Sequence, residues 1–344
     1  MERHEMLLLH RMLTSATHPL QAAERAPRLL ETWLRHAPES RPEERDWEDW
    51  AENASMLHAL ATHGEVILLP EDSRYRPFGS HSIMVQPQPN APKAVMWGMF
   101  RFEDSLSFPI AADLRWNGAS AVNRVMDYPS SPVFQTRVGR AFHVCDMDHG
   151  QVRQALLDIH ATGARRGFYK TRSKGPTHAF DMGEDSASLW NDFDPENDIA
   201  WDIVNKEGMR GEIYLQAAFR PTREYRMVVV GRKVVCGAGC IEAYTPLDSV
   251  GNVFDDRVEV RRNDGKVIVD IRTVDEYVSF ARRYAREWAD AHGDDTAYSL
   301  DLSLDAETGD VIPIEMNPLQ NLGLYANRPD LIVEAMLEEA KVQA

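Results

Sequence analysis

Cysteine is scarce in this sequence, and its scarcity excludes a fold held together by disulfides. Only three cysteines occur, Cys145, Cys236 and Cys240. Their small, odd number is typical of a protein kept in a reducing compartment. Cys236 and Cys240 lie close together in VVCGAGCIEAY, but no second pair of ligands accompanies them. We therefore expect buried thiols here and not a metal site.

Positive charge is also in deficit. The chain has 54 Asp and Glu residues against 38 Lys and Arg, for a formal net charge of -16. Such an excess opposes non-specific attraction to nucleic acid or to an anionic membrane surface. Any phosphate group that this chain binds must be held by a local basic site.

Long apolar runs are missing as well. No stretch approaches the length needed to span a bilayer. The opening MERHEMLLLHRML is interrupted by acids and histidines, and no small-residue cleavage site follows it. We therefore expect no signal peptide, and a cytoplasmic protein.

Several catalytic signatures are absent too. The sequence contains no H-E-x-x-H, no G-x-S-x-G, no C-x-x-C and no Walker G-x-x-x-x-G-K-[ST] pattern. Zinc-peptidase, hydrolase-elbow, dithiol and P-loop chemistry are thereby disfavoured.

What is present predicts a multi-lobed α+β protein. A chain of 344 residues that is 43% hydrophobic is long enough for two or three subdomains. Residues 1–64 are predicted to be helical, with a capping box at Ser40 and Glu43 and an apolar stripe before Gly64. That stripe is interpreted as core packing and comprises Trp47, Trp50, Ala54, Leu57 and Ala61.

Residues 65–145 change to short strand-like runs, VILLP, SIMVQ and AVMWGMF, separated by Pro, Gly and Asn. Asp148 and Gln151 then predict the start of a helix that Gly163 ends. The strand GFYKT follows at once and carries Lys170. We expect an ordered loop over KTRSKGPTHAF and a surface segment after it.

The last third of the chain alternates strands and helices. EIYLQAAF and EYRMVVVGRKVVCGAG predict strands, with a hairpin turn at GRK. TVDEYVSFARRYAREWADAHG predicts an amphipathic helix that ends at Gly293. TAYSLDLSLD and DVIPIEMN predict a second hairpin, and Pro329 suits the first position of a closing helix.

The second hairpin gathers oxygen ligands. Asp301 lies on its first strand, while Glu315 and Asn317 are two residues apart at the end of the second and so share a face. A few carboxylate and amide oxygens suit magnesium carried by a nucleotide better than a structural ion. The alternative is a pair of solvated acids beside a turn, which the D-x(13)-E-x-N spacing across paired strands disfavours.

This segment, YSLDLSLDAETGDVIPIEMNPLQNLGLY, resembles the last part of the ATP-grasp superfamily, an Asp-bearing strand, a turn and a strand that ends in Glu-x-Asn-Pro. The order of elements over roughly residues 145–340 is similar too. The resemblance implies two α/β lobes that grip ATP at 146–235 and 236–344. A small α/β lobe at 65–145 and the helical segment 1–64 would precede them.

The resemblance also implies site residues. A lysine before a small-residue loop grips phosphate in this family, which indicates Lys170 first and Lys174 second, although a loop lysine is ordinarily only solvated. Arg226, two positions after Glu224 and on the same strand face, is expected to meet a phosphate or acyl-phosphate oxygen, or else to form a cross-strand pair with a glutamate. The remaining implied roles are adenine binding by Gln216, Ala217, Ala218 and Phe219, ribose binding by Glu224, and magnesium binding by Asp301, Glu315 and Asn317.

Gln216 stands where the family usually has an acid, so backbone groups of its segment are expected to contribute to adenine binding. A narrower resemblance is to a small ATP-grasp clade of phages and bacterial accessory loci, through VMWGMF, Lys174 and NLGLY. That clade often has an arginine where this chain has Lys170.

These features predict an ATP- and magnesium-dependent ligase that activates a carboxylate as an acyl phosphate and couples it to an amine. A kinase acting on a small hydroxyl acceptor and a nucleotide-binding module without turnover are the alternatives. The expected partners are small-molecule or peptide carboxylates and amines, and a homodimer is left open. Nothing in the sequence selects the donor or the acceptor.

Overall fold

Helices and antiparallel sheets share this chain, and the fold is α+β. In the computed structural model the described residues are 26–36, 47–62, 65–69, 82–86, 95–97, 124–146, 148–171, 177–182, 212–260, 265–319 and 322–342. Lys174 and the predicted capping box at Ser40 and Glu43 lie outside them.

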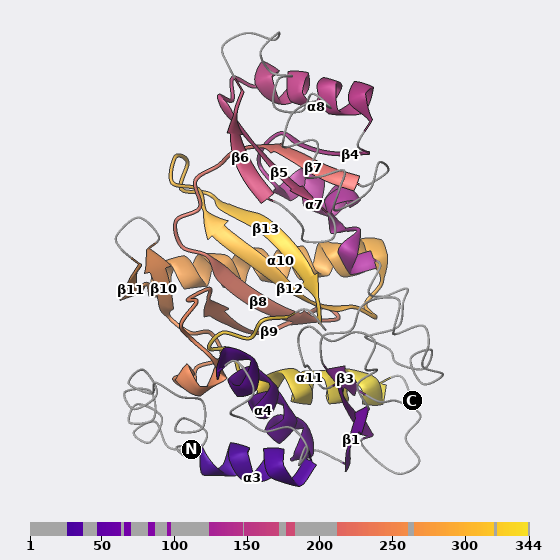
Figure 1. The fold of residues 1–344 in the computed structure, drawn as a ribbon, viewed down its shortest axis with the longest axis vertical. Coiled ribbons are helices and arrows are strands. Elements are labelled where there is room, and N and C mark those ends of the chain that lie inside the picture. The colour runs from indigo at the N-terminus through magenta and orange to yellow at the C-terminus, as the bar shows by residue number, and fades with distance from the viewer. Residues whose placement is uncertain are drawn as a thin grey trace. The chain divides into compact units, whose positions relative to one another are not determined.

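The chain divides into two compact units, which are described separately. The first unit comprises Met1–Val125, Thr222–Ser303 and Ile314–Ala344. The second comprises Met126–Pro221 and Leu304–Pro313. Each unit contains a four-stranded sheet (Figure 1).

The sheet of the second unit has the strand order β4-β7-β5-β6. Its core lies between β4, β5, β7 and the apolar side of α8, where Val152, Leu156 and Ile159 are buried. The bounds of the elements are β4 Phe142–Asp146, β5 Arg166–Thr171, β6 Thr177–Asp181, β7 Glu212–Ala217, η4 Tyr128–Ser130, α7 Pro132–Arg137 and α8 His149–Ala161.

The start of α8 agrees with its prediction in part. The Asp148 carboxylate accepts from the backbone N–H groups of Gly150 and Gln151, as an N-cap does. The Gln151 side chain accepts from the backbone N–H of Asp146 at 3.3 Å, so it extends the cap toward β4. Gly163, at φ +86°, follows the helix end as predicted.

One prediction in this unit was wrong. THAF was assigned to an ordered loop and Asp181 to the surface segment after it, whereas Thr177–Asp181 forms β6 and pairs antiparallel with β5. The strand is recognisable only through its partner, because Gly167 on β5 leaves the space that the Phe180 ring of β6 fills. Pairing with β5 therefore makes this segment a strand, and its local composition does not reveal it.

The sheet of the first unit has the order β13-β12-β8-β9, and both predicted hairpins are confirmed in it. Gly231, at φ +58°, makes the turn between β8 and β9. The bounds of the elements are β8 Tyr225–Val230, β9 Lys233–Gly239, β12 Ala297–Leu304, β13 Val311–Pro318, α10 Ile271–His292 and α11 Pro329–Val342.

Alternation along β8 sends its side chains to two different layers. Tyr225 packs against Tyr277 of α10, with ring centroids 5.5 Å apart. Val228 and Val230 belong instead to the core cluster that includes α4 and α11. Arg226, which alternates with Tyr225, therefore lies on the α4 and α11 side of the sheet.

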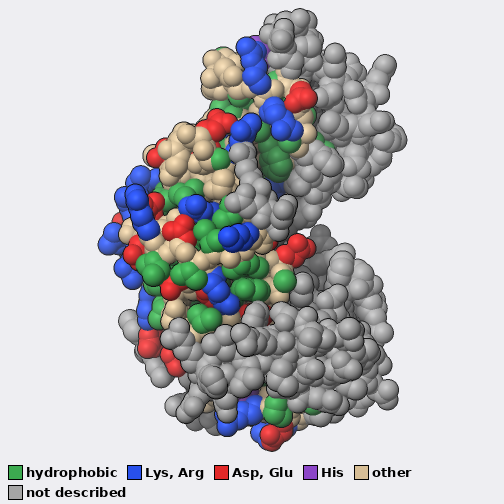
Figure 2. All heavy atoms as spheres, turned by 90° about the vertical axis from the view of Figure 1, so that its left-hand side faces the viewer, with side chains coloured by type: hydrophobic (Ala, Val, Ile, Leu, Met, Phe, Trp, Pro, Cys, Tyr) green, Lys and Arg blue, Asp and Glu red, His purple; other side chains and the backbone are tan. Residues whose placement is uncertain are grey.

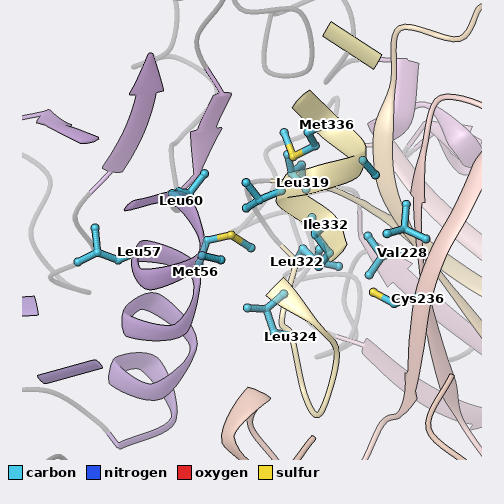
Figure 3. Packing of buried hydrophobic residues seen from close by; sticks show 14 of the residues in the cluster. Met56, Leu57, Leu60, Val228, Cys236, Leu319, Leu322, Leu324, Ile332 and Met336 are labelled. Atoms are coloured by element: carbon cyan, nitrogen blue, oxygen red, sulfur yellow. The ribbon is translucent and has the colours of Figure 1, made fainter. Parts of the chain in front are cut away.

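The N-terminal helices are part of this core. They comprise α3 (Pro27–His36) and α4 (Trp47–Ala61). Trp50, Ala54 and Leu57 are buried, which confirms the predicted packing role for these three residues of the stripe, and Ala61 is half-buried. Figure 3 shows Met56 of α4 directed toward the side that carries Leu319, Leu322 and Leu324.

Smaller elements complete the first unit. The strand-like runs predicted after Gly64 form a three-stranded sheet of order β1-β2-β3, and a two-stranded hairpin precedes α10. Their bounds are β1 Glu65–Leu69, β2 Ser82–Gln86, β3 Val95–Trp97, η6 Pro246–Asp248, β10 Arg257–Val260 and β11 Lys266–Val269.

The predicted lobe boundaries cut through two strands. The boundary at residue 145 falls within β4, and the boundary at residue 235 falls within β9. Since β8, β9 and β12 hydrogen-bond in one sheet, they are parts of one structural layer.

The cysteines behave as buried thiols, as predicted. Cys145, Cys236 and Cys240 are buried, and none of the three forms a disulfide. Burial raises the pKa of Cys236 to about 12, and it does the same for Cys145. Both thiols are protonated at neutral pH and pack as small apolar groups.

On the face drawn in Figure 2, Lys and Arg side chains lie among Asp and Glu side chains. Arg328 with Asp330 and Arg257 with Asp255 are two ion pairs of the first unit. Among the described helices, none is long and apolar enough to cross a membrane.

Gly239, at the end of β9, tests how tightly the first unit is packed. A Cβ there would lie 2.5 Å from the backbone oxygen of Arg257 and 3.3 Å from the Cα of Val258. Because backbone atoms cannot rotate away, Gly239→Ala should lower the free energy of unfolding by about 3 kcal/mol. Urea unfolding followed by circular dichroism measures this loss.

Gly163→Ala is the matched control, since a Cβ there meets nothing within 4 Å and only the φ of +86° is unfavourable. It should cost about 1 kcal/mol. Equal losses in the two variants would contradict a steric role for Gly239.

Candidate functional site

Arg226 and Asp301 form a buried ion pair at the centre of the first unit's sheet. They are direct cross-strand partners, Arg226 on β8 and Asp301 on β12. Arg226 Nε donates to Asp301 Oδ1 at 2.7 Å, and Nη2 donates to Oδ2 at 2.6 Å. Arg226 is 7% exposed and Asp301 is 5% exposed. This two-pronged geometry is the strongest that a guanidinium and a carboxylate can adopt.

The pair also determines the charge state of the arginine. Burial by itself lowers the pKa of Arg226, but the charge and the hydrogen bonds of Asp301 more than reverse that effect. The pKa of Arg226 therefore lies well above its usual value. The guanidinium stays charged under all ordinary conditions.

This pairing gives Arg226 a partner that the sequence did not predict. The alternatives considered were a phosphate contact and a cross-strand pair with a glutamate, and Asp301 was considered only as a metal ligand. Glu224 is half-buried directly before β8, and its backbone carbonyl accepts from Cys240 N–H. The carboxylate that Arg226 meets comes from β12, and register between strands far apart in sequence is not readable locally.

Glu315 and Asn317 lie together on β13, as their spacing of two predicts. Asn317 Nδ2 donates to Glu315 Oε1 at 3.0 Å, and to Ser299 Oγ of β12 at 3.4 Å. Asn317 is 1% exposed, and its Oδ1 atom is buried without a hydrogen-bond partner in the described part of the chain. A buried amide oxygen in this state is costly unless a ligand meets it.

The donor set fits magnesium by its chemistry. Glu315 offers a half-buried carboxylate, and Asn317 offers an orphaned amide oxygen beside it. No group of three His, Cys, Asp or Glu side chains that could hold a metal occurs among the described residues. A three-ligand set therefore depends on the Asn317 amide, and a cation here would keep waters or phosphate oxygens as further ligands.

A segment after β13 surrounds Arg226, and sequence reasoning did not assign it a role. Arg226 Nη1 donates to the Gly323 carbonyl at 2.9 Å, and the guanidinium carbon lies 5.0 Å from the centre of the Tyr325 ring. Burial raises the pKa of Tyr325, so its phenol stays protonated. The backbone N–H groups of Leu324 and Tyr325 donate to Glu52 of α4. The apolar helix around Glu52 had suggested packing alone.

In the second unit, Lys170 lies on β5 as predicted. It pairs in register with Tyr214 of β7 and with Thr177 of β6, and its side chain is half-buried. Lys170 is therefore held by strands on both sides, a rigid position for a side chain that carries charge.

Gln216, the predicted hinge residue, has an arginine partner that sequence reasoning missed. Arg140 Nε donates to Gln216 Oε1 at 2.7 Å, and the Arg140 guanidinium carbon lies 4.2 Å from the centre of the Phe219 ring. Burial lowers the pKa of Arg140 to about 10, although Tyr128 and Asp305 offset it in part. The one available signal was Gln216 itself, an amide where an acid is usual in the resembled family.

Two backbone N–H groups of the predicted hinge already donate hydrogen bonds within the second unit. The N–H of Ala217 donates to the Ala141 carbonyl, and the N–H of Ala218 donates to the Arg166 carbonyl, each at 2.9 Å. A nucleotide base could use these two donors only by breaking bonds within the second unit. Phe219, the next residue, is held through its ring by Arg140.

Comparisons with known proteins give only a structural likeness. No family model matches the chain, and no curated protein matches it. The ATP-grasp ligase PsnB with precursor peptide PsnA2 and AMPPNP is similar with a TM-score of 0.45 and 12% identity, over 83% of this chain and 92% of PsnB. D-cycloserine synthetase DcsG is similar with a TM-score of 0.42 and 13% identity, over 70% of this chain and 78% of DcsG.

The D-alanine-D-alanine ligase from Coxiella burnetii is similar with a TM-score of 0.39 and 15% identity, over 66% of this chain. This chain spans 60% of that ligase, and 64% of PsnB in its complex with a minimal precursor. At these values the likenesses decide neither the reaction nor the substrates, so the residues must carry the functional argument.

The ion pair predicts non-additive stability losses. Arg226→Met and Asp301→Leu should each lower the free energy of unfolding by about 3–5 kcal/mol, because each leaves a buried charged group without its partner. The double variant Arg226→Met, Asp301→Leu should lose about 2 kcal/mol less than the sum of the two single changes. Urea unfolding of the unaltered protein, the two single variants and the double variant gives the coupling energy.

Lys233 and Glu338 form an exposed pair and supply the control. Lys233→Met should leave the unfolding midpoint almost unchanged, because water and salt screen exposed ions. Strictly additive losses at Arg226 and Asp301 would show that the pair is not coupled.

Proposed function

We propose that this protein is an ATP-grasp ligase, dependent on ATP and magnesium, that joins a carboxylate to an amine. The observation that carries the proposal is the buried, orphaned Asn317 Oδ1 beside Glu315, on a strand whose sequence ends Glu-x-Asn-Pro. An oxygen donor in this state is suited to a cation, and this pair of donor types is suited to magnesium.

The proposed reaction has two steps. A carboxylate oxygen attacks the γ-phosphorus of ATP and ADP leaves; an amine nitrogen then attacks the acyl carbon and inorganic phosphate leaves, with loss of the amine proton. The first step converts a poor leaving group into phosphate. Such chemistry needs charge neutralisation and positioning more than a protein nucleophile.

Arg226 is proposed to serve phosphate oxygens as well as Asp301. A guanidinium has five N–H groups, of which two donate to Asp301 and one to Gly323. The other two are proposed to meet a phosphate or acyl-phosphate oxygen. The fixed pairing with Asp301 would orient them before the substrate arrives, and such preorganisation favours the transition state.

Glu315 and Asn317 are proposed as magnesium ligands, with Asp301 as the third. When bound, the ion would neutralise phosphate charge. Because Asp301 is already held by Arg226 through both oxygens, its share in the site would be limited to an additional contact by one of them. Glu315 is therefore the better residue for a functional test.

The second unit is proposed to contribute Lys170 and Lys174 to phosphate and Gln216 with Phe219 to adenine. Arg140 would fix the Gln216 amide and the Phe219 ring in place. Glu224, from the first unit, is proposed as the ribose contact. A location in the cytoplasm and membership of the small phage and bacterial clade stay predictions from the sequence.

A kinase that phosphorylates a hydroxyl is the second candidate, since the same residues would serve it. Incubation with ATP, magnesium and a metabolite extract, followed by mass spectrometry, separates the two reactions. Ligation gives a condensed product of acid and amine, and an ¹⁸O-labelled carboxylate would transfer one label to inorganic phosphate. A stable phosphorylated acceptor without label transfer would contradict ligation.

Glu315→Gln should reduce ATP turnover by about 100-fold or more, because it removes the negative charge from a proposed magnesium ligand. The free energy of unfolding should change little, since Gln keeps the acceptor for Asn317 Nδ2. ADP release and urea unfolding measure the two quantities.

Asp310→Asn provides the control, an acid of the same hairpin that is exposed at its turn. It should leave turnover unchanged. Equal turnover in Glu315→Gln and the unaltered protein would remove the magnesium assignment.

A further inference from the structure

The N-terminal helix α4 contributes a charged residue to the surroundings of Arg226. Glu52 is half-buried on a helix whose neighbouring residues Trp50, Ala51 and Ala54 are fully buried. Its carboxylate does not project alone into solvent. Oε1 accepts from the backbone N–H of Leu324 at 2.5 Å and from that of Tyr325 at 3.2 Å.

Two consecutive N–H groups directed at one oxygen form a small anion-binding concavity in the backbone. Tyr325 provides the required geometry with φ +47°, and it is the only non-glycine residue with a positive φ in the described part of the chain. Side chains other than glycine rarely adopt this conformation. Its presence here indicates that the contact with Glu52 compensates for an unfavourable backbone.

The same backbone segment grips Arg226 from its other side. The Gly323 carbonyl accepts from Arg226 Nη1, and a Cβ at Gly323 would lie only 2.9 Å from that nitrogen. The Tyr325 ring lies against the guanidinium. Residues 323–325 therefore contact Arg226 through a carbonyl and a ring, while the N–H groups of Leu324 and Tyr325 donate to Glu52.

Apolar packing holds the helix where this contact is made. Met56 of α4 belongs to one buried cluster with Leu319, Leu322 and Leu324, and Figure 3 shows it directed toward them. Leu322 and Leu324 flank Gly323, so the helix and the segment share a core on both sides of the carbonyl that Arg226 uses. The position of Glu52 is thereby fixed by packing of α4 against Leu319, Leu322 and Leu324, which follow β13.

We infer that Glu52 is a positioning residue for Arg226 and Asp301, and this inference rests on the proposed function. Its carboxylate holds residues 323–325, these hold the Arg226 guanidinium, and Arg226 holds Asp301 through two hydrogen bonds. Helix α4 is thus part of the structural unit that carries the candidate site.

The inference is tested with Glu52→Ala, which removes the carboxylate, and Glu52→Gln, which keeps an oxygen acceptor of the same length. Glu52→Ala should speed hydrogen exchange at the Leu324 and Tyr325 amides about tenfold or more and weaken the binding of Mg·ATP about tenfold. Glu52→Gln should stay within about threefold of the unaltered protein in both. Hydrogen-exchange mass spectrometry and calorimetric titration with Mg·ATP give the two readouts.

Acetate separates positioning from simple structural support. At tens of millimolar it should restore much of the lost Mg·ATP affinity of Glu52→Ala, because a free carboxylate can occupy the vacated N–H groups, and it should not affect the unaltered protein. Glu31→Ala, which removes an exposed carboxylate from α3, is the control and should change neither readout.

The outcomes are distinguishable. If the unaltered protein does not bind Mg·ATP, the proposed function fails. If it binds Mg·ATP and Glu52→Ala binds it equally well, or exchange at Leu324 and Tyr325 is unchanged, the positioning role alone is overturned. Loss of affinity in Glu52→Ala without recovery in acetate would also overturn it, since the defect would then be one of helix packing.

Discussion

The buried pair of Arg226 and Asp301 is the interaction on which the candidate site depends. A charged guanidinium that is 7% exposed is tolerable only with a partner of opposite charge and with acceptors for its remaining N–H groups. Asp301 satisfies the first condition and Gly323 contributes to the second. The register of β8 with β12 places Asp301 opposite Arg226, and the segment after β13, held by Glu52 of α4, provides the Gly323 carbonyl.

Around that pair, side chains of β8 and β12 alternate between two faces of the sheet that differ in composition. Side chains of β8 and β12 that face α10 are large and apolar, as in the contacts of Tyr225 and Tyr298 with its aromatic residues. Those on the other face include Arg226, Asp301 and Ser299. Asn317 joins them through Ser299, whereas Met316 between Glu315 and Asn317 meets Tyr284 of α10. The face toward α10 is apolar at these contacts, whereas the other face carries both the groups suited to ligands and, at Val228 and Val230, part of the core shared with α4 and α11.

The second unit also contains an arginine that is partly removed from water, but its partners Gln216 and Phe219 are uncharged. Arg140 is half-buried beside an amide and an aromatic ring, and the lowering of its pKa by burial is not reversed as it is at Arg226. The neutral Gln216 amide compensates the charge less than a carboxylate would, and its hydrogen bond with Arg140 keeps the Gln216 side chain in one orientation. The two arginines therefore differ in partner. Arg226 is locked into an ion pair, whereas Arg140 organises a segment proposed to meet the base.

The sequence alone was sufficient for most helices and strands, for both hairpins of the first unit's sheet and for the proximity of Glu315 and Asn317. These features follow from periods of 3.6 and 2 residues and from glycine at turns, which are local properties. Only the tertiary structure decided that Arg226 meets Asp301, 75 residues away, and that Glu52 meets Leu324, 272 residues away. It also decided that THAFD is a strand and that Arg140 lies under Gln216. Such pairings depend on register and on which faces pack together, and the free energy that selects them appears only when distant segments exclude water from a common core.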